Sequence, residues 1–345
     1  MRCMTLADAL HQRGARIRFV SRHIPVHLHG RLTGKGYEFV LLDSSTNVVI
    51  SEGISHAHWL GSSQQADAQD TIHALSDQTW DWLIVDHYAL DARWETAFRK
   101  TGQNILVIDD LADRPHRCKL LLDQNLGRQP QDYQGLVPAH CQVLTGPRYA
   151  LLRPEFATLR TYSLQRRQSQ PALRQLLITM GGVDQPNATG QVLQALKTCA
   201  LPPACRITVV MGLTAPWLQN VRELAAQMPW PTEVAVNVDD MAQRMADSDL
   251  AIGAAGSTSW ERCCLGLPTL MVVLAENQQF GAQAMEAAHA ARLIGAVSDI
   301  AMQLSLAVAE LIKSERQSRM SLAASAITDG RGVDIILKAM GVIDA

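Results

Sequence analysis

The chain has 345 residues, of which 47% are hydrophobic and 19% charged, and its formal net charge is -2 at pH 7. This length suggests about two domains, each large enough to bury its own core. The charge is balanced and there is no long basic run, so the sequence lacks the positive patch expected of a protein that binds nucleic acid or an anionic membrane. We therefore expect small-molecule partners. No apolar run approaches the ~20 residues that cross a bilayer, and the first residues lack the apolar centre of a signal peptide. We therefore expect a cytoplasmic protein.

Short apolar runs alternate with helical patterns along the first half of the chain. The chain opens on a helical pattern over residues 1–13, with Gly14 as its C-cap. Such alternation predicts a parallel sheet covered by helices. The expected strands are Arg16–Ser21, Phe39–Leu42, Trp82–Asp86, Asn104–Asp109 and Lys119–Leu122, and the further helices are Ala66–Gln78 and Asp91–Lys100.

The order of these first elements is unusual. A doubly wound domain normally opens with a strand at the centre of its sheet, and the turn after that strand supplies the ligand loop. Here a helix comes first, and Ala15–Ser21 takes the place of the second strand. We therefore predict that the first domain is incomplete at its start and lacks its first strand.

The second half of the chain repeats the same alternation. Between the halves lie Gly146–Phe156 and a polar stretch, Thr161–Gln170, so we assign residues 1–150 to a first domain and 151–345 to a second. The tail from Asp299 to Lys338 is expected to be helical. The predicted fold class is α/β, with two doubly wound Rossmann-like domains facing a cleft. The expected strands are Gln175–Met180, Arg206–Val210, Glu233–Asn237, Asp249–Ile252 and Thr269–Leu274, and the expected helices are Asn187–Thr198, Ala215–Gln227, Ser257–Leu265 and Gln279–His289.

A glycine-rich loop follows the strand that ends at Ile252. Gly253 and Gly256 free the backbone to turn, and Ser257 or Thr258 is placed to cap a helix. Amide groups at such a helix start favour a diphosphate, and Glu261, one turn in, is placed to accept both hydroxyls of a ribose. A tight turn that only packs explains the same glycines equally well.

A second loop of this kind follows Leu177–Met180. It contains Gly181, Gly182 and Asp184 and leads into the next helical pattern. Two such loops meeting at one place favour a nucleotide site more than either alone. That they meet is an assumption at this point.

Polar side chains also follow the strands of the first domain. Asp86, His87 and Tyr88 end a buried strand, where an α/β protein carries catalytic groups, although the same residues can simply cap a helix. Turn formation is the more probable role of the polar residues at Asp109–Asp110 and Asp123–Asn125. The other histidines lack metal-ligand spacing and the seven cysteines are scattered, so no metal, cofactor or disulfide framework is expected.

Taken together, these motifs resemble one bacterial family, the UDP-2,4-diacetamido-2,4,6-trideoxy-beta-L-altropyranose hydrolases of pseudaminic acid biosynthesis. The resemblance runs from Met1 to about residue 290, and it implies a two-domain fold of the glycosyltransferase B type. The implied reaction is metal-independent: water attacks the anomeric carbon of a UDP-sugar, and UDP leaves with inversion. The motifs that carry the resemblance are Asp86–Tyr88, Asp109–Asp110, Leu122–Asn125, Gly146–Phe156, Met180–Asp184, Gly253–Glu261 and Glu276–Gln278.

The resemblance also implies which residues act. Tyr88 would lie beside the reacting centre, with His87 as the second catalytic candidate. UDP would be held by residues of the glycine-rich loops and Glu261, and the sugar or diphosphate by the loop after Thr269–Leu274. The implied substrate-binding residues are Arg2, Arg153, Gly181, Gly182, Asp184, Gly256, Ser257, Thr258, Glu261, Asn277 and Gln278.

The general base implied by the resemblance is a histidine in a G-x-G-H loop. Met1–Ala7 is similar to the family segment that follows this loop, so the histidine would lie just upstream of residue 1. Either the start is assigned too far downstream or the first domain is truncated. For the 345 residues themselves we expect UDP binding with negligible hydrolysis, because a lost base costs ~10²–10⁴-fold in rate.

Two other functions remain open. A glycosyltransferase of similar fold would have much the same donor site, and a non-catalytic UDP-sugar binder is compatible with a truncated first domain. An acceptor requirement separates the first from a hydrolase, and absence of turnover identifies the second.

Overall fold

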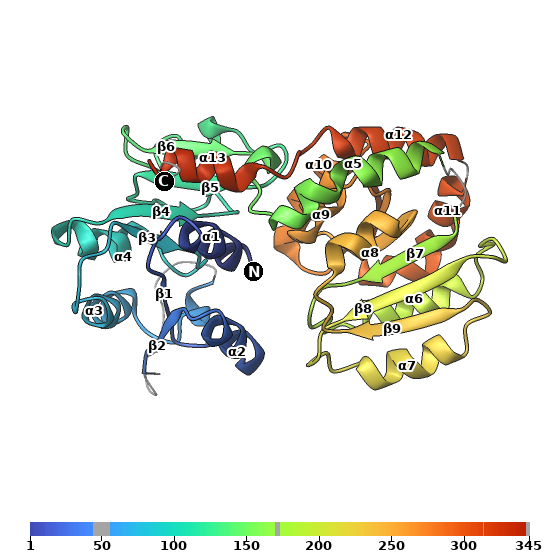
Figure 1. Ribbon diagram of the computed structural model, residues 1–345, viewed down its shortest axis with the longest axis horizontal. Coiled ribbons are helices and arrows are strands. Elements are labelled where there is room, and N and C mark those ends of the chain that lie inside the picture. Colours follow the sequence, from blue (N-terminus) through green and yellow to red (C-terminus); the bar gives the residue numbers. More distant parts are fainter. Residues whose placement is uncertain (44–55, 170–172, 313, 343–345) are drawn as a thin grey trace. The chain divides into compact units, whose positions relative to one another are not determined.

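The computed structural model describes residues 1–43, 56–169, 173–312 and 314–342 (Figure 1). The chain divides into two compact units. Unit 1 comprises Met1–Leu151 and the chain from Val333 onward, and unit 2 comprises Leu152–Gly332. All strand pairs are parallel and helices cover the sheets, which confirms the predicted α/β class with two Rossmann-like units.

Unit 2 is built on one six-stranded parallel sheet of order β12-β11-β10-β7-β8-β9. The strand order reverses between β7 and β10, which are neighbours although two strands separate them in the chain. The strands are β7 (Gln175–Thr179), β8 (Arg206–Met211), β9 (Thr232–Val236), β10 (Leu250–Ala254), β11 (Thr269–Val273) and β12 (Arg292–Ala296). The helices are α5 (Pro154–Ser169), α6 (Ala188–Leu196), α7 (Leu218–Ala226), α8 (Met241–Asp247), α9 (Thr258–Cys264), α10 (Gln279–Ala287), α11 (Ile300–Leu311) and α12 (Ser314–Ser325).

The central strands of unit 2 are apolar because helices cover both faces of the sheet. Every residue of β10 and β11 is buried, so these segments appear as continuous apolar runs without alternation. Leu176, Ile178 and Ile252 join one core with side chains from α6 and α11.

Unit 1 contains two separate sheets. The smaller pairs β1 (Arg18–Ser21) with β2 (Glu38–Leu41), and the larger has the order β3-β4-β5-β6. The larger sheet consists of β3 (Trp82–Val85), β4 (Asn104–Ile108), β5 (Leu120–Asp123) and β6 (Gln142–Thr145). The helices are α1 (Arg2–His11), α2 (Val26–Gly34), α3 (Gln64–Ala74), α4 (Ala92–Ala97) and the C-terminal α13 (Gly332–Ala339).

A cavity of about 930 Å³ separates β1 from β3. It is lined by every residue of 15–25 and of 78–87. Side chains on one face of a strand alternate, so an unbroken run of lining residues means that the strand edges face the cavity. Within the described ranges, no strand pairs with the inner edge of β1 or of β3. The interruption lies where the sequence predicted that a central strand is lacking.

The units divide between Leu151 and Leu152, one residue from the predicted boundary at 150/151. The polar residues that follow, up to Ser169, were given no helix in the prediction but belong to α5, a helix of unit 2 whose Ser163 and Arg167 are buried. Arg167 donates to carbonyl oxygens of Met245, Ser248 and Leu265, so polar composition here reflects hydrogen bonding between elements of unit 2.

The end of the chain also differs from the prediction, which placed all of 151–345 in the second domain. Ile336 and Leu337 of α13 are buried in one core with Leu106 and Leu120 of unit 1 (Figure 1). Elements absent from the prediction are α2, α5, α8, β6 and β12.

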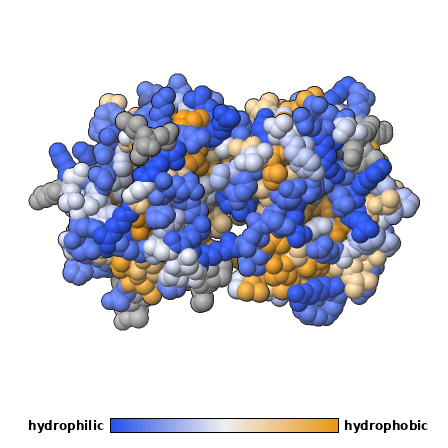
Figure 2. All heavy atoms as spheres, in the orientation of Figure 1, coloured by the Kyte–Doolittle hydropathy of each residue, from blue (hydrophilic) through white to orange (hydrophobic). Residues whose placement is uncertain are grey.

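The surface in Figure 2 is largely hydrophilic, with apolar side chains gathered in patches. The most exposed large apolar residues of unit 2 include Leu213 and Val183, which lie in loops that follow strands. Among the helices of the described residues, none has the length and apolar content needed to cross a membrane.

Candidate functional site

Three loops of unit 2 leave the same edge of its sheet. Strands β7 and β10 are paired in parallel with Thr179 opposite Gly253, and β11 pairs with β10 on its other side. The carboxyl ends of parallel neighbours lie together, so the loops after β7, β10 and β11 are adjacent. This pairing confirms the assumed meeting of the two glycine-rich loops. The place is the topological switch point, where open α/β sheets bind ligands.

The loop after β10 leaves backbone donors free. The amide of Ala255 donates to the carbonyl of Val272 at 2.9 Å. For the amide groups of Gly256, Ser257 and Thr258, the described part of the chain supplies no acceptor. The side chain of Ser257 makes no capping bond, contrary to the predicted cap, and α9 has only seven residues. The free loop amides, more than a helix dipole, therefore favour an anion here.

The loop after β7 is exposed and tightly held from one side. Gly181 has a φ of +87°, a conformation that glycine adopts without strain. A Cβ at Gly212 would lie 2.0 Å from the carbonyl oxygen of Gly182, so the loop after β8 packs directly against this backbone. A side chain at either Gly181 or Gly212 would displace the loop.

Asp184 holds the start of α6. Its two carboxylate oxygens accept the amide groups of Ala188 and Thr189, each at 2.9 Å, and its side chain is buried. Asn187, with a φ of +56°, adds a bond to the amide of Gly190. The structure thus shows Asp184 capping a helix, and its predicted ligand contact stays a prediction.

Glu261 lies in the first turn of α9, beyond the free amide groups. Desolvation by the surrounding protein raises the pKa of Glu261 to about 7, although the positive charges of Arg153 and Arg262 act in the opposite direction. Arg153 also packs over the Phe156 ring at 5.4 Å and lies 3.4 Å from Glu155. At neutral pH, Glu261 is therefore close to half-protonated, and its predicted contact with a ribose stays a prediction.

The loop after β11 reaches back to the glycine-rich loop. The Oε1 atom of Gln278 accepts the amide of Leu274 at 3.0 Å, and its Nε2 lies 3.8 Å from the position of a Cβ at Gly256. The neighbouring Asn277 is exposed. Gln278 is thus fixed beside the free amide groups, and Asn277 is available to a ligand.

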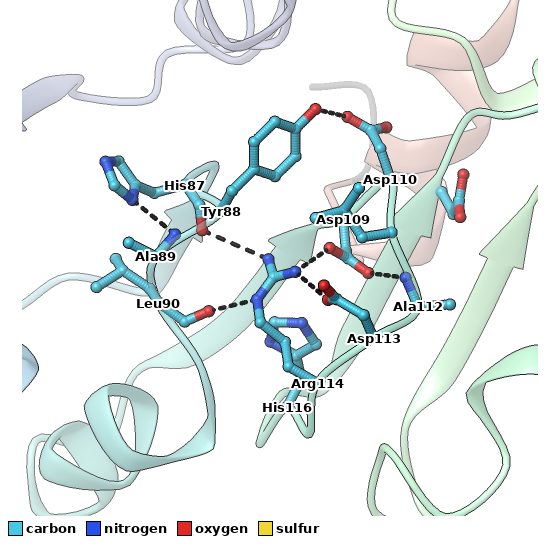
Figure 3. Close-up of polar contacts among 12 residues, drawn as sticks. His87, Tyr88, Ala89, Leu90, Asp109, Asp110, Ala112, Asp113, Arg114 and His116 are labelled. Carbon is cyan, nitrogen blue, oxygen red and sulfur yellow. Dashed lines mark hydrogen bonds and ion pairs between the residues drawn. The ribbon is translucent and has the colours of Figure 1, made fainter. Parts of the chain in front are cut away.

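Unit 1 brings a second set of predicted residues together at the ends of β3 and β4. The Tyr88 hydroxyl donates to Asp110 at 2.7 Å (Figure 3). The guanidinium of Arg2, from the start of α1, bonds both to Asp86 and to Asp110, at 2.7 and 2.8 Å. Asp110 therefore links the phenol to the arginine.

In this cluster the positive charge of Arg2 is paired with the negative charges of Asp86 and Asp110. Burial alone would favour protonated Asp86, but the hydrogen bond and charge of Arg2 lower its pKa below the ordinary value. Burial and the Asp110 carboxylate raise the pKa of Tyr88, so the phenol stays protonated. Arg2 has two carboxylates against it, so its role toward a diphosphate stays a prediction.

His87 and Tyr88 point away from each other (Figure 3). The Nδ1 atom of His87 accepts the amide of Ala89 at 3.1 Å, which places the ring proton on Nε2. Burial lowers the pKa of His87, so the imidazole is neutral at pH 7. It lines the cavity between β1 and β3, whereas Tyr88 faces Asp110.

A buried ion pair supports the loop that carries both residues. Arg114 lies 2.9 Å from Asp109 and donates to the carbonyl of Leu90. Asp109 also accepts the amide of Ala112, as expected of a turn-forming residue, and the hydroxyl of Tyr133 lies 2.9 Å from it. Sequence patterns did not single out Arg114 or Tyr133, because their partners are distant in the chain.

An aromatic group beside Tyr88 was also missed. The ring centroid of Trp59 lies 5.7 Å from that of Tyr88, and His56 lies 5.5 Å from Tyr88. The Trp59 residue is 49% exposed. Exposed aromatic faces next to carboxylates offer both apolar contact and hydrogen bonds, a combination that suits a sugar. Among the described residues, His, Cys, Asp and Glu side chains form no group of three that could hold a metal.

Comparisons with known proteins agree with this arrangement. Residues 177–331 match the glycosyltransferase family 28 C-terminal domain. This range includes all three loops of unit 2. The chain is 27% identical over 211 residues to the UDP-2,4-diacetamido-2,4,6-trideoxy-beta-L-altropyranose hydrolase of Campylobacter jejuni, covering 61% of this chain and 72% of that one. The resemblance to this hydrolase is confirmed.

Solved structures show the same fold at low sequence identity. MurG of Acinetobacter baumannii matches with a TM-score of 0.69 and 14% identity, covering 99% of this chain and 95% of that chain. A putative UDP-N-acetylglucosamine 2-epimerase from Listeria monocytogenes matches with a TM-score of 0.63 and 13% identity, covering 97% and 91%. These structures support the glycosyltransferase B type of fold.

Proposed function

We propose that this protein acts on a UDP-linked diacetamido-trideoxy sugar, cleaving the bond between the anomeric carbon and the diphosphate with water and releasing UDP. The observation that carries the proposal is the switch point of unit 2, where three loops meet beside Glu261 and the amide groups of Gly256, Ser257 and Thr258 have no acceptor within the described residues. It lies within the match to the family 28 C-terminal domain, and the similarity to the Campylobacter hydrolase supports the choice of reaction.

Unit 2 supplies the groups that a leaving UDP requires. The amide groups of Gly256, Ser257 and Thr258, with those of the loop at Gly181 and Gly182, would donate hydrogen bonds to the diphosphate. These bonds would stabilise the negative charge that builds on it as UDP leaves. Fixed backbone donors stabilise such charge without reorganising during the reaction. Glu261 in its ionised form would accept hydrogen bonds from the ribose hydroxyls. Asn277 and Gln278 would contact the diphosphate or the sugar.

Unit 1 supplies the groups that would act on the sugar. Tyr88 carries its proton at neutral pH and donates it to Asp110, so its oxygen would accept a hydrogen bond from a sugar hydroxyl or from the attacking water. His87 is neutral at pH 7 and would donate a hydrogen bond from Nε2, and it would accept a proton only where the Ala89 amide releases Nδ1. We propose these two residues as the catalytic candidates of unit 1.

The test is the release of free sugar and UDP from the candidate UDP-sugar, followed by NMR of the products. For an active enzyme, we expect Tyr88→Phe to lower kcat about 10- to 100-fold and His87→Gln about 100-fold, with the Kd for UDP unchanged, because neither residue is in unit 2. His140→Gln serves as a control, because this exposed histidine lies elsewhere in unit 1. Loss of UDP binding in either catalytic variant would contradict these roles.

A glycosyltransferase with a UDP-sugar donor is the second candidate function. The match to a glycosyltransferase family domain favours it, since unit 2 would hold the donor in the same way. Turnover that requires an acceptor sugar would identify a transferase, whereas release into water alone identifies a hydrolase. Binding of UDP without turnover under either condition would identify a UDP-sugar-binding protein.

A further inference from the structure

A buried arginine lies beneath the loop that follows β10. Arg262 belongs to α9, and only 1% of its surface is exposed. Its Nη2 donates to the carbonyl of Ala254 at 2.7 Å and to Ser259 Oγ at 3.0 Å. Its Nη1 donates to Thr258 Oγ1 at 3.2 Å. The guanidinium therefore bonds to both ends of the segment whose free amide groups form the proposed diphosphate site.

The fit between Arg262 and the strand end is close. A Cβ at Gly253 would lie 2.5 Å from Nη1 of Arg262, so the guanidinium packs directly on the backbone of β10. Gly253 has an ordinary backbone conformation, because it is not among the glycines with positive φ. Its lack of a side chain here makes room for the arginine and does not serve a turn.

The charge of Arg262 is not neutralised by a contact within the described residues. Its hydrogen bonds go to neutral oxygens, and its Nε has no partner. Glu261 acts on it electrostatically without a recorded hydrogen bond. Burial lowers the pKa of Arg262 to about 10, so the group remains charged at pH 7. Burying a cation without a bonded counter-charge is costly, which points to an anion that binds nearby.

We propose that Arg262 is a positioning residue that supplies a fixed positive charge beneath the loop, and that the diphosphate of UDP bound to the loop amide groups is its counter-charge. The inference rests on the proposed function and adds a residue that does not touch the ligand. If the inference is right, loss of the Arg262 charge weakens the affinity for a ligand more strongly the more negative charge that ligand carries. A bracing role alone would affect charged and neutral ligands equally.

The experiment compares UDP, UMP and uridine by isothermal titration calorimetry on the full chain at pH 8. Arg262→Gln keeps hydrogen-bond donors and removes the charge, whereas Arg262→Lys keeps the charge and loses the planar fork. Arg167→Gln is the matched control, because Arg167 is also buried in unit 2 and also bonds to backbone carbonyls. Circular dichroism verifies that each variant is folded.

For Arg262→Gln we expect the affinity for UDP to fall by at least about tenfold, that for UMP by about threefold and that for uridine by less than about twofold. Arg262→Lys should keep the ratio of UDP to uridine affinity within about threefold of the wild type. Arg167→Gln should leave that ratio unchanged. If Arg262→Gln does not fold, Arg262→Met, which also removes the charge, decides by the same ratio.

Equal weakening of all three ligands in Arg262→Gln would overturn the proposal in favour of bracing alone, and so would an Arg262→Lys protein that loses the preference for UDP over uridine. Unchanged UDP affinity in Arg262→Gln would overturn it as well. If the wild-type chain binds none of the three ligands, the proposed function itself fails, and this inference fails with it. The two failures are therefore distinguished by the wild-type titration.

Discussion

The sheets of the two units differ at their centres. In unit 2 the strand order β9-β8-β7-β10-β11-β12 is continuous, and β7 is the middle strand from which both wings extend. In unit 1 the order β2-β1 is followed by a cavity and then by β3-β4-β5-β6. The cavity thus occupies the position that β7 occupies in unit 2. The comparison shows that, within the described residues, the switch point holds a paired strand in unit 2 and a cavity in unit 1.

The difference extends to the ligand loops. In unit 2 the loop after β7 contributes Gly181 and Gly182 to the switch point, opposite the loop after β10. In unit 1 the switch point is bordered by the start of α1 and by Asp86 and His87 at the end of β3. Unit 2 presents backbone donors for an anion, whereas unit 1 presents side chains with compensated charges.

The largest expected difference between the units concerns hydrogen exchange. Amide groups on the inner edges of β1 and β3 lack strand partners within the described chain, whereas β7 is paired on both sides. We expect the amide groups of β3 to exchange about 10²- to 10³-fold faster than those of β7 at pH 7, measured by mass spectrometry. Equal protection of β3 and β7 would contradict an open edge in unit 1.

The close approach of two loops in unit 2 gives the next largest effect. In Gly212→Ala the new Cβ would meet the carbonyl of Gly182 at 2.0 Å, so the loop after β7 must move. We expect a loss of about 2–3 kcal/mol in the free energy of unfolding, measured by urea denaturation, together with weaker UDP binding. Gly182→Ala is the control for stability, because no atom lies within 4 Å of its Cβ position. A Gly212→Ala protein as stable as the control would refute this packing.

The smallest effect concerns the pH dependence of unit 2. The pKa of Glu261 is raised to about 7 from an ordinary value near 4.5, so the folded state binds more protons than the unfolded state between these values. Stability therefore falls as pH rises from 4.5 to 7, and Glu261→Gln removes this loss. We expect the variant to gain about 1–2 kcal/mol over the wild type at pH 8 and little at pH 4.5, by denaturation.

Uridine binding tests the same group from the ligand side. Because only the carboxylate accepts both ribose hydroxyls, the affinity for uridine should rise from pH 6 to pH 8 in the wild type. It should not change with pH in Glu261→Gln. Uridine is preferred to UDP here because it carries no phosphate that titrates in this range. A parallel rise in the variant would exclude Glu261 as the group responsible.

The sequence predicted elements well where local patterns determine them. Strands β7 to β11 of unit 2 were located within one or two residues, and for β7, β10 and β11 the reason is that helices cover both faces of the sheet, so the runs are apolar. The first helix follows from periodicity, but it ends at His11 with Gln12 as its C-cap, and Gly14, which was predicted as the C-cap, lies two residues further with a φ of +84°. Strand β12 was missed because Gly295 and Ala296 interrupt its apolar pattern.

Two departures from the prediction near the domain boundary and the chain end have a tertiary cause. The polar residues of 161–169 were given no helix, but they belong to α5, from which Arg160 and Arg167 satisfy carbonyl oxygens of distant parts of unit 2. The final helix was assigned to the second domain because it is adjacent in the chain. Its strongly one-sided apolar face packs instead on the sheet of unit 1, which sequence order does not reveal.

By itself, the sequence determined the α/β class, the two glycine-rich loops and the break in the first sheet, because these depend on local periodicity and on the order of elements. Only the tertiary structure decided which loops meet, since pairing of β7 with β10 joins Thr179 and Gly253, which are 74 residues apart in the chain. It also decided how charges are matched. Asp184 bonds to a helix, Arg2 to two carboxylates and Arg262 to neutral oxygens alone, because burial and contact depend on three-dimensional packing.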